Sequence, residues 1–188
     1  MPLSPETLTA NAEVLEQLSW TFGLRFDIDP KEPSWFSVDG AERITPIARD
    51  SAGGVFALIS GSPRLLYVSS EGAAGVVAAD LDEFMALIVA CPCWHDLLKF
   101  SGSGKLDEMR RAATVLEMGT VDDEELEEAS ALLKSELALA EPADPVGALH
   151  HAVSSSDLII RDQYGGRFES LFNTFVIDEE RMRKLFGA

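Results

Sequence analysis

Two thiols and an imidazole lie close together in the segment Cys91-Pro92-Cys93-Trp94-His95, and side chains of these types can bind a metal ion or exchange disulfides. The spacing fits neither chemistry, because redox motifs contain Cys-x-x-Cys and haem attachment requires Cys-x-x-Cys-His. A zinc site would need two further ligands. The other histidines, His150 and His151, are adjacent, so on a helix they point about 100° apart. We therefore expect no metal site and no cofactor, and we predict buried thiols at a helix end.

The segment Gly102-Ser103-Gly104-Lys105 is similar to part of a phosphate-binding loop, in which backbone amides surround a phosphate group. That motif requires a glycine five residues before its second glycine, where this chain has Lys99. It also requires Ser or Thr after the lysine, where this chain has Leu106. We interpret the segment as a loop between two helices.

Nucleophilic catalysis needs a serine or cysteine beside a base and an orienting acid. The chain has three histidines and no Gly-x-Ser-x-Gly elbow, so the sequence identifies no catalytic residue. Arg49 and Asp50 precede Gly53 and Gly54, and an aspartate followed by glycines is typical of a turn. We therefore predict that Asp50 fixes a hairpin and takes no part in a site.

A short acidic segment is the strongest candidate for partner recognition; its members are Asp122, Asp123, Glu124, Glu125, Glu127 and Glu128. One interpretation is a solvated helix N-terminus, where each acid in the first turn gains about 0.3–1 kcal/mol from the helix dipole. That gain does not reach Glu127 and Glu128, which repel their neighbours. The other interpretation is a recognition surface for a basic partner, which would explain why the repulsion is tolerated. Both interpretations remain open.

The whole chain is acidic too, with 32 Asp and Glu against 15 Lys and Arg and a net charge of −17. Such a surface repels phosphate backbones and attracts basic proteins, so we expect a basic protein partner and no nucleic acid. No apolar run approaches the ~20 residues of a membrane helix, and the N-terminus lacks the basic and apolar regions of a signal peptide. We expect a cytoplasmic protein with reduced thiols and no membrane partner.

The first half of the chain contains the elements of a sheet. A helix is predicted from Pro5 to Phe22, followed by a connecting loop over 24–40 with a short strand at Trp35–Val38. Four apolar segments separated by Gly, Pro, Ser and Asp are typical of an antiparallel meander, and they cover 43–48, 55–60, 64–69 and 75–79. Asp80 then begins a helix that Pro92 ends or kinks.

The second half becomes mainly helical. Helices are predicted over Leu106–Met118, Asp122–Ala140, Asp144–Val153 and Asp178–Phe186, with a β-hairpin over Leu158–Phe172. The predicted fold class is α+β, an antiparallel meander with helices packed on it and a mainly helical C-terminal extension. We divide the chain into an α+β core over 1–100 and an extension with a terminal hairpin over 101–188, within one globular unit.

Three pieces in the first half occur in a fixed order. They read Ile47-Ala48-Arg49-Asp50-x-x-Gly53-Gly54-x-Phe56-Ala57-Leu58, then Leu66-Tyr67-Val68-x-x-Glu71-Gly72, then Val77-Ala78-Ala79-x-Leu81-x-Glu83-Phe84. In this order and spacing they resemble the SUKH superfamily, whose best-known bacterial members are immunity proteins of polymorphic toxin systems. The resemblance covers about residues 44–90.

The resemblance implies an α+β fold and a non-catalytic function, the neutralisation of a cognate toxin domain that is often a nuclease or deaminase. A nuclease that binds phosphate backbones is basic, and an acidic inhibitor would complement its charge. Two other hypotheses remain open. One is a small enzyme or ligand-binding protein with a pocket between the sheet and the C-terminal helices. The other is a cytosolic regulatory scaffold that uses the same fold for a host partner.

Overall fold

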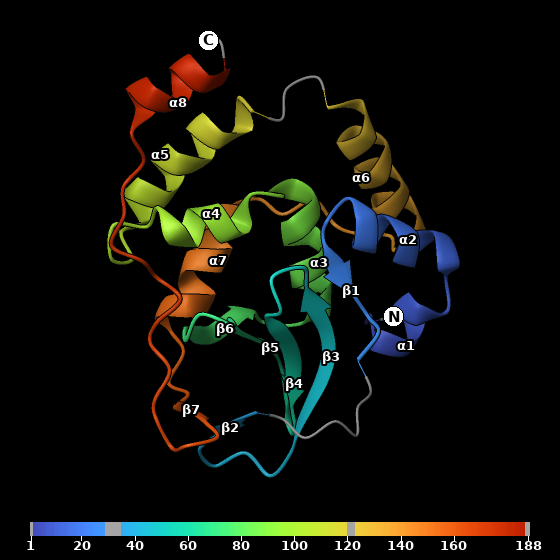
Figure 1. Ribbon diagram of the computed structural model, residues 1–188. Coiled ribbons are helices and arrows are strands. Elements are labelled where there is room, and N and C mark those ends of the chain that lie inside the picture. Colours follow the sequence, from blue (N-terminus) through green and yellow to red (C-terminus); the bar gives the residue numbers. More distant parts are fainter. Residues whose placement is uncertain (1, 29–34, 120–122, 187–188) are drawn as a thin grey trace.

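A five-stranded antiparallel sheet forms the centre of the computed structural model, which describes residues 2–28, 35–119 and 123–186 (Figure 1). Its strands lie in the order β1 (Leu24–Arg25), β3 (Ile44–Asp50), β4 (Val55–Ile59), β5 (Ser62–Val68) and β6 (Ala74–Ala78). Strands β3 to β6 follow one another as the predicted meander, so the α+β fold class is confirmed. Strand β1 pairs with the end of β3 in a region where we predicted only a loop.

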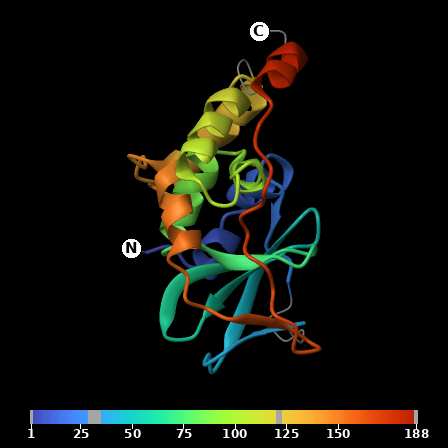
Figure 2. The ribbon, with the colours of Figure 1, turned by 90° about the vertical axis from the view of Figure 1, so that its left-hand side faces the viewer.

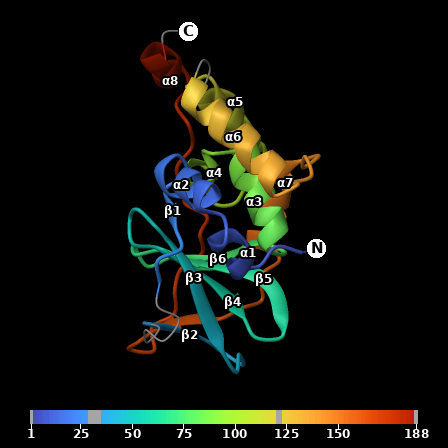
Figure 3. The same cartoon turned by 90° about the vertical axis from the view of Figure 1, so that its right-hand side faces the viewer.

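The helices gather on one side of this sheet, as the three views show (Figures 1, 2 and 3). The N-terminal pair is α1 (Pro5–Thr9) and α2 (Ala12–Trp20), and the six others are α3 (Leu81–Ala90), α4 (Trp94–Lys99), α5 (Leu106–Glu117), α6 (Glu124–Glu136), α7 (Pro145–Ser154) and α8 (Glu179–Phe186). The single N-terminal helix that we predicted is broken, because the Asn11 side chain accepts the amides of Glu13 and Val14 and starts a second helix.

Both faces of the central strands are buried, which explains their continuous apolar sequence. On β4 and β5, Phe56, Leu65 and Tyr67 face the helices and belong to the larger core. The alternating residues Leu66 and Val68 face the opposite way and belong to a smaller core. The alternation follows from the two-residue period of a strand, and each face needs its own covering layer.

A two-stranded ribbon covers the smaller core. It consists of β2 (Phe36–Val38) and β7 (Ile160–Asp162), which pair in antiparallel register. The hairpin that we predicted over Leu158–Phe172 is therefore only partly correct. The turn exists, with a bridge between Arg161 and Arg167, but the ladder partner of β7 is β2.

The segment after the ribbon runs back across the molecule to α8 and connects the two halves (Figure 2). The carbonyl of Glu169 accepts the amide of Ala74 beside the sheet. The amides of Gly102 and Ser103 donate to the carbonyls of Phe175 and Asn173 at 2.8 and 2.7 Å. Residues Gly102 to Lys105 thus form a connecting loop between two helices, as predicted. Two amides of this loop hold the segment that leads to α8.

Candidate functional site

An open groove lies between α2 and α6 and is the surface to which the acidic segment contributes. Its volume is about 520 Å³, and it is lined by Glu13, Glu16, Gln17, Trp20, Thr21, Glu125, Glu128, Ala129 and Leu132. We call this surface the α2–α6 groove. Two helices that are far apart in the sequence each provide two of its glutamates.

Trp20 is the most unusual residue of the α2–α6 groove, because 83% of this large aromatic side chain is exposed. It lies at the last position of α2, and the buried residues of that helix, Val14 and Leu18, face the core. Leaving a tryptophan in water forgoes the stabilisation that burial of such a large apolar side chain provides. An exposed aromatic among charged side chains is the pattern of an interaction site.

Local interactions hold α6 against α2. Ala129 and Leu133 are buried, and the Asp123 carboxylate accepts the amide of Leu126 at 3.1 Å and caps the helix. At the other end of the helix, the Asn11 amide donates to the Glu136 carboxylate at 2.9 Å. The helix is therefore anchored to the rest of the protein at its centre and at its C-terminal end, and its N-terminal end is capped locally.

The structure divides the six predicted partner-binding residues. Glu125 and Glu128 line the α2–α6 groove, whereas Asp123, Glu124 and Glu127 are exposed on α6 outside its lining. Asp122 lies outside the described residues.

Sequence reasoning missed the contribution of α2. Glu13, Glu16 and Trp20 follow each other at spacings of three and four, which places them on one face of a helix. That spacing was a usable signal, but only the structure brings this face beside α6.

Negative charge in the α2–α6 groove has no cationic counterpart within the part of the chain that the structure describes. The ion pairs among the described residues join other side chains. None of them includes Glu13, Glu16, Glu125 or Glu128. All four carboxylates belong to exposed residues, so they remain solvated. A basic surface that docks there would gain Coulombic attraction without first breaking an internal ion pair.

A second polar cluster lies beneath the helices, around Asp50. This residue is only 7% exposed, and its Oδ1 accepts the amides of Ala52 and Gly54 at 2.9 and 2.8 Å. The predicted turn role is therefore confirmed. The Tyr67 hydroxyl donates to the other oxygen, Oδ2, at 2.6 Å, an interaction that sequence reasoning missed because β5 supplies it.

The surroundings shift the pKa values of two side chains beside Asp50, namely Tyr67 and His95. Burial raises the pKa of Tyr67, and the adjacent Asp50 carboxylate raises it further, so the phenol stays protonated and keeps donating. The His95 side chain is 43% exposed, but its ring packs against Tyr67 and Trp94, and this partial desolvation lowers its pKa below 6.5, although Asp50 and Asp96 oppose the shift. The His95 Nε2 lies 3.8 Å from Asp50 Oδ2, beyond hydrogen-bonding distance. A neutral imidazole therefore faces a buried carboxylate.

The two cysteines lie where α3 ends and α4 begins. Cys91 is buried, Cys93 is half-buried, and their sulfur atoms are 3.5 Å apart. The hydrogen bond between the thiols raises the pKa of Cys91 and lowers that of Cys93. Among the described residues, no three His, Cys, Asp or Glu side chains are grouped as a metal ion would require. His150 instead donates to the carbonyl of Gly104 at 2.9 Å.

Comparisons with known proteins identified no relative. No family model matches the chain, and neither curated proteins nor solved structures gave a match. Among the described residues, the helices are too short or too polar to cross a bilayer.

Proposed function

We propose that this protein is a non-catalytic, cytoplasmic binding protein that neutralises a basic toxin domain, of the nuclease or deaminase type, as an immunity protein. The observation that carries the proposal is the exposed Trp20 beside four glutamates in the α2–α6 groove. The resemblance of residues 44–90 to the SUKH superfamily supports the choice of a toxin as the partner.

In the proposed interface, Trp20 would supply the apolar anchor, and the glutamates around it would form a charged rim. A tryptophan provides much of the affinity in many protein interfaces, and truncation of such a residue costs about 2 kcal/mol or more. Glu13, Glu16, Glu125 and Glu128 would orient a basic partner, and the net charge of −17 would accelerate the encounter.

A non-catalytic role is supported by the way in which the reactive side chains are used. The Asp50 carboxylate closes a turn and accepts a hydrogen bond from the Tyr67 hydroxyl, and the two free thiols share a hydrogen bond. His150 is engaged by a backbone carbonyl. These contacts are those of structural groups.

A ligand-binding protein is a second candidate, favoured by one observation. A depression of about 520 Å³ lies between α4, the β5–β6 turn and the segment 169–175, so it is bordered by the sheet and by the C-terminal part of the chain. A regulatory scaffold would use the same α2–α6 groove and would differ from the proposed immunity protein only in the identity of its partner.

Affinity capture with matched variants tests the proposal. We expect the wild-type chain and Glu124→Gln/Glu127→Gln to retain one basic protein at low salt, and Trp20→Ala and Glu125→Gln/Glu128→Gln to lose it. The two double variants remove the same charge from the same helix, but only the second changes the groove.

Co-expression of this chain with the captured protein then tests whether that partner is a toxin. The wild-type chain should suppress the toxicity of the captured protein, and Trp20→Ala should not. Equal retention by all four chains would refute the groove as the docking site. A captured protein without toxicity would favour the scaffold.

A further inference from the structure

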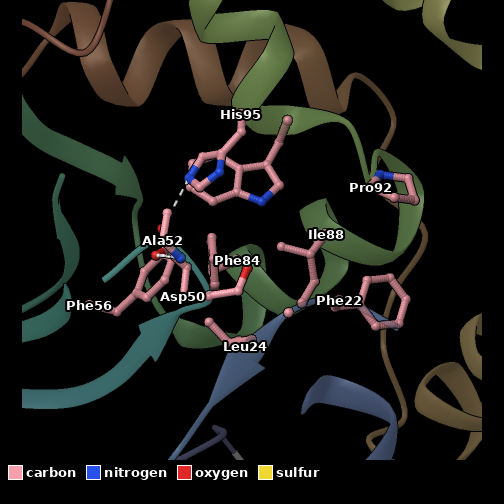
Figure 4. A pocket seen from close by; sticks show the side chains of 12 residues that line it. Phe22, Leu24, Asp50, Ala52, Phe56, Phe84, Ile88, Pro92 and His95 are labelled. Atoms are coloured by element: carbon pink, nitrogen blue, oxygen red, sulfur yellow. Dashed lines mark hydrogen bonds and ion pairs between the residues drawn. The ribbon is translucent and has the colours of Figure 1, made fainter. Parts of the chain in front are cut away.

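A small cavity opens beside the Asp50 cluster and is separate from the α2–α6 groove. Its volume is about 120 Å³, close to the roughly 150 Å³ of an engineered cavity that accepts benzene. Figure 4 shows Asp50 and His95 on one side of this space and Phe22 and Pro92 on the other. The rim residues Ala52, Pro92 and His95 are exposed, so the cavity is open to solvent.

Aromatic rings form much of the cavity wall. Phe56 and Phe84 are each 1% exposed and lie 5.0 Å apart between ring centroids, and Trp94 stands edge-on to Phe84 at 5.6 Å. Phe22 closes the opposite side. The faces of such rings carry partial negative charge and attract cations.

Asp50 places a carboxylate group beside this aromatic wall. A carboxylate has about four acceptor positions, two on each oxygen. The amides of Ala52 and Gly54 occupy both positions on Oδ1, and the Tyr67 hydroxyl occupies one on Oδ2. One position on Oδ2 remains for a further donor, because His95 Nε2 is too distant at 3.8 Å.

No lysine or arginine lies opposite Asp50 among the described residues that line the cavity. Of the described residues that line it, Asp50 is the one carboxylate and His95 is the one basic group. Partial desolvation favours the uncharged imidazole. Three donors already satisfy this carboxylate, and an incoming cation that donates to the remaining position on Oδ2 would add a charge-assisted hydrogen bond.

We propose that this cavity binds the guanidinium group of an arginine side chain, with Asp50 as its counter-ion and the aromatic rings as its walls. A guanidinium is planar and weakly hydrated, stacks on aromatic faces, and donates several hydrogen bonds in one plane. These properties match a narrow aromatic cavity that has a carboxylate on one side.

The position of the cavity suggests the source of the arginine. Thr21 lines the α2–α6 groove, and Phe22, the next residue, lines the cavity. A basic protein seated in the groove could therefore extend one arginine around the end of α2. This source rests on the proposed function, whereas binding of the guanidinium itself can be measured without any partner.

Titration of the intact protein with N-acetyl-arginine amide, followed by amide NMR, tests the proposal. The neutral isostere N-acetyl-citrulline amide is the matched ligand control, and N-acetyl-lysine amide tests whether an ammonium group suffices. We expect saturable shifts at the amides of Ala52 and Gly54 and at the Trp94 indole. Citrulline should bind about ten-fold more weakly, because it lacks the charge.

Two variants locate the site. Asp50→Asn retains an oxygen for the two turn amides and should weaken arginine binding about ten-fold. Ile88→Phe places a larger side chain in the cavity lining without altering the carboxylate and should abolish binding. Asp96→Asn removes a charge beside His95 but outside the cavity lining, and should leave binding unchanged.

Several outcomes would overturn the inference. They are no saturable binding, equal affinity for citrulline, tighter binding of the lysine derivative, or arginine binding that persists in both Asp50→Asn and Ile88→Phe. None of these outcomes bears on the groove, because capture by the Trp20 and glutamate variants is measured separately. Conversely, failure of the capture experiment would not affect the guanidinium site, but it would remove the basic protein proposed to supply the arginine.

Discussion

Asp50 uses its two carboxylate oxygens for different purposes. Oδ1 closes the β3–β4 turn by accepting two amides, and Oδ2 accepts the Tyr67 hydroxyl beside the cavity. The turn can form in this way because Gly54 lets the carboxylate and the phenol approach its backbone. A Cβ atom at Gly54 would lie 2.5 Å from the Tyr67 hydroxyl and 2.7 Å from Asp50 Oδ2.

Gly54→Ala should therefore destabilise the protein by about 1–3 kcal/mol, the usual cost of overpacking a close contact. Its neighbour Gly53 has a φ of +90°, and a Cβ atom there would meet nothing nearer than 3.9 Å. Gly53→Ala should cost less, about 1 kcal/mol, from backbone strain alone. Urea unfolding of the two variants measures the difference. A smaller effect at Gly54 would contradict the geometry.

His95 should make stability depend on pH. Its pKa in the folded chain is lower than the ordinary value of 6.5, so below that pH the unfolded chain binds a proton that the folded chain does not. Acidification through this window therefore destabilises the fold until the folded pKa is also passed. The groups that face the ring are Asp50, Tyr67 and Asp96.

Thermal unfolding from pH 7 to pH 5 should thus show a shallower loss of stability in His95→Gln than in the wild-type chain. His151→Gln, at an exposed histidine of α7, is the control and should follow the wild-type profile. Parallel profiles for the wild-type chain and His95→Gln would show that the pKa of His95 is the same in the folded and unfolded chains.

At the scale of elements, the contact between α2 and α6 depends on Asn11. Its side-chain oxygen caps α2, and its amide nitrogen donates to Glu136 at the end of α6. Asn11 therefore fixes the relative position of the two helices that form the α2–α6 groove.

Asn11→Ala should lower the free energy of unfolding by about 0.5–2 kcal/mol, the range for loss of an N-cap. Glu136→Ala removes only the link between the helices and leaves the cap intact, so it should cost less, about 0.5–1.5 kcal/mol. Chemical denaturation compares the two variants. An equal loss in both would mean that the cap contributes nothing beyond the link.

The sequence predicts an element well when its interaction partners lie close by in the chain, and poorly when they lie far away. Strands β3 to β6 are joined by short turns, so their apolar segments and glycines located them. Strand β1 has two residues, and the partner of β7 lies more than a hundred residues away, so neither pairing has a local signal. The acidic segment was visible, but the groove also needed α2, and the cavity at Asp50 needed Phe84 from α3 and His95 from α4.

At the scale of the whole molecule, the net charge of −17 should govern how fast a basic partner arrives. We expect the association rate to fall steeply as salt is raised, because screening shortens the reach of surface charge. Glu125→Gln/Glu128→Gln should reduce this salt dependence. Trp20→Ala should act mainly on the dissociation rate and raise the Kd roughly 30-fold.

Surface plasmon resonance with the captured partner, over a series of salt concentrations, separates the two rates. Glu124→Gln/Glu127→Gln is the charge-matched control and should keep the wild-type affinity. An association rate that is insensitive to salt would argue against electrostatic steering.

The ribbon that covers the outer face of the sheet has a consequence for biosynthesis. Strand β2 emerges early from the ribosome, but its partner β7 is made only after α3 to α7. Until then, Leu66 and Val68 of the nascent sheet lack the Ile160 side chain that belongs to their core. Nascent chains fold from the N-terminus as they are made, and unpaired apolar strands are prone to aggregate. The yield of folded protein should therefore depend on how well chaperones protect this face before residue 160 is translated.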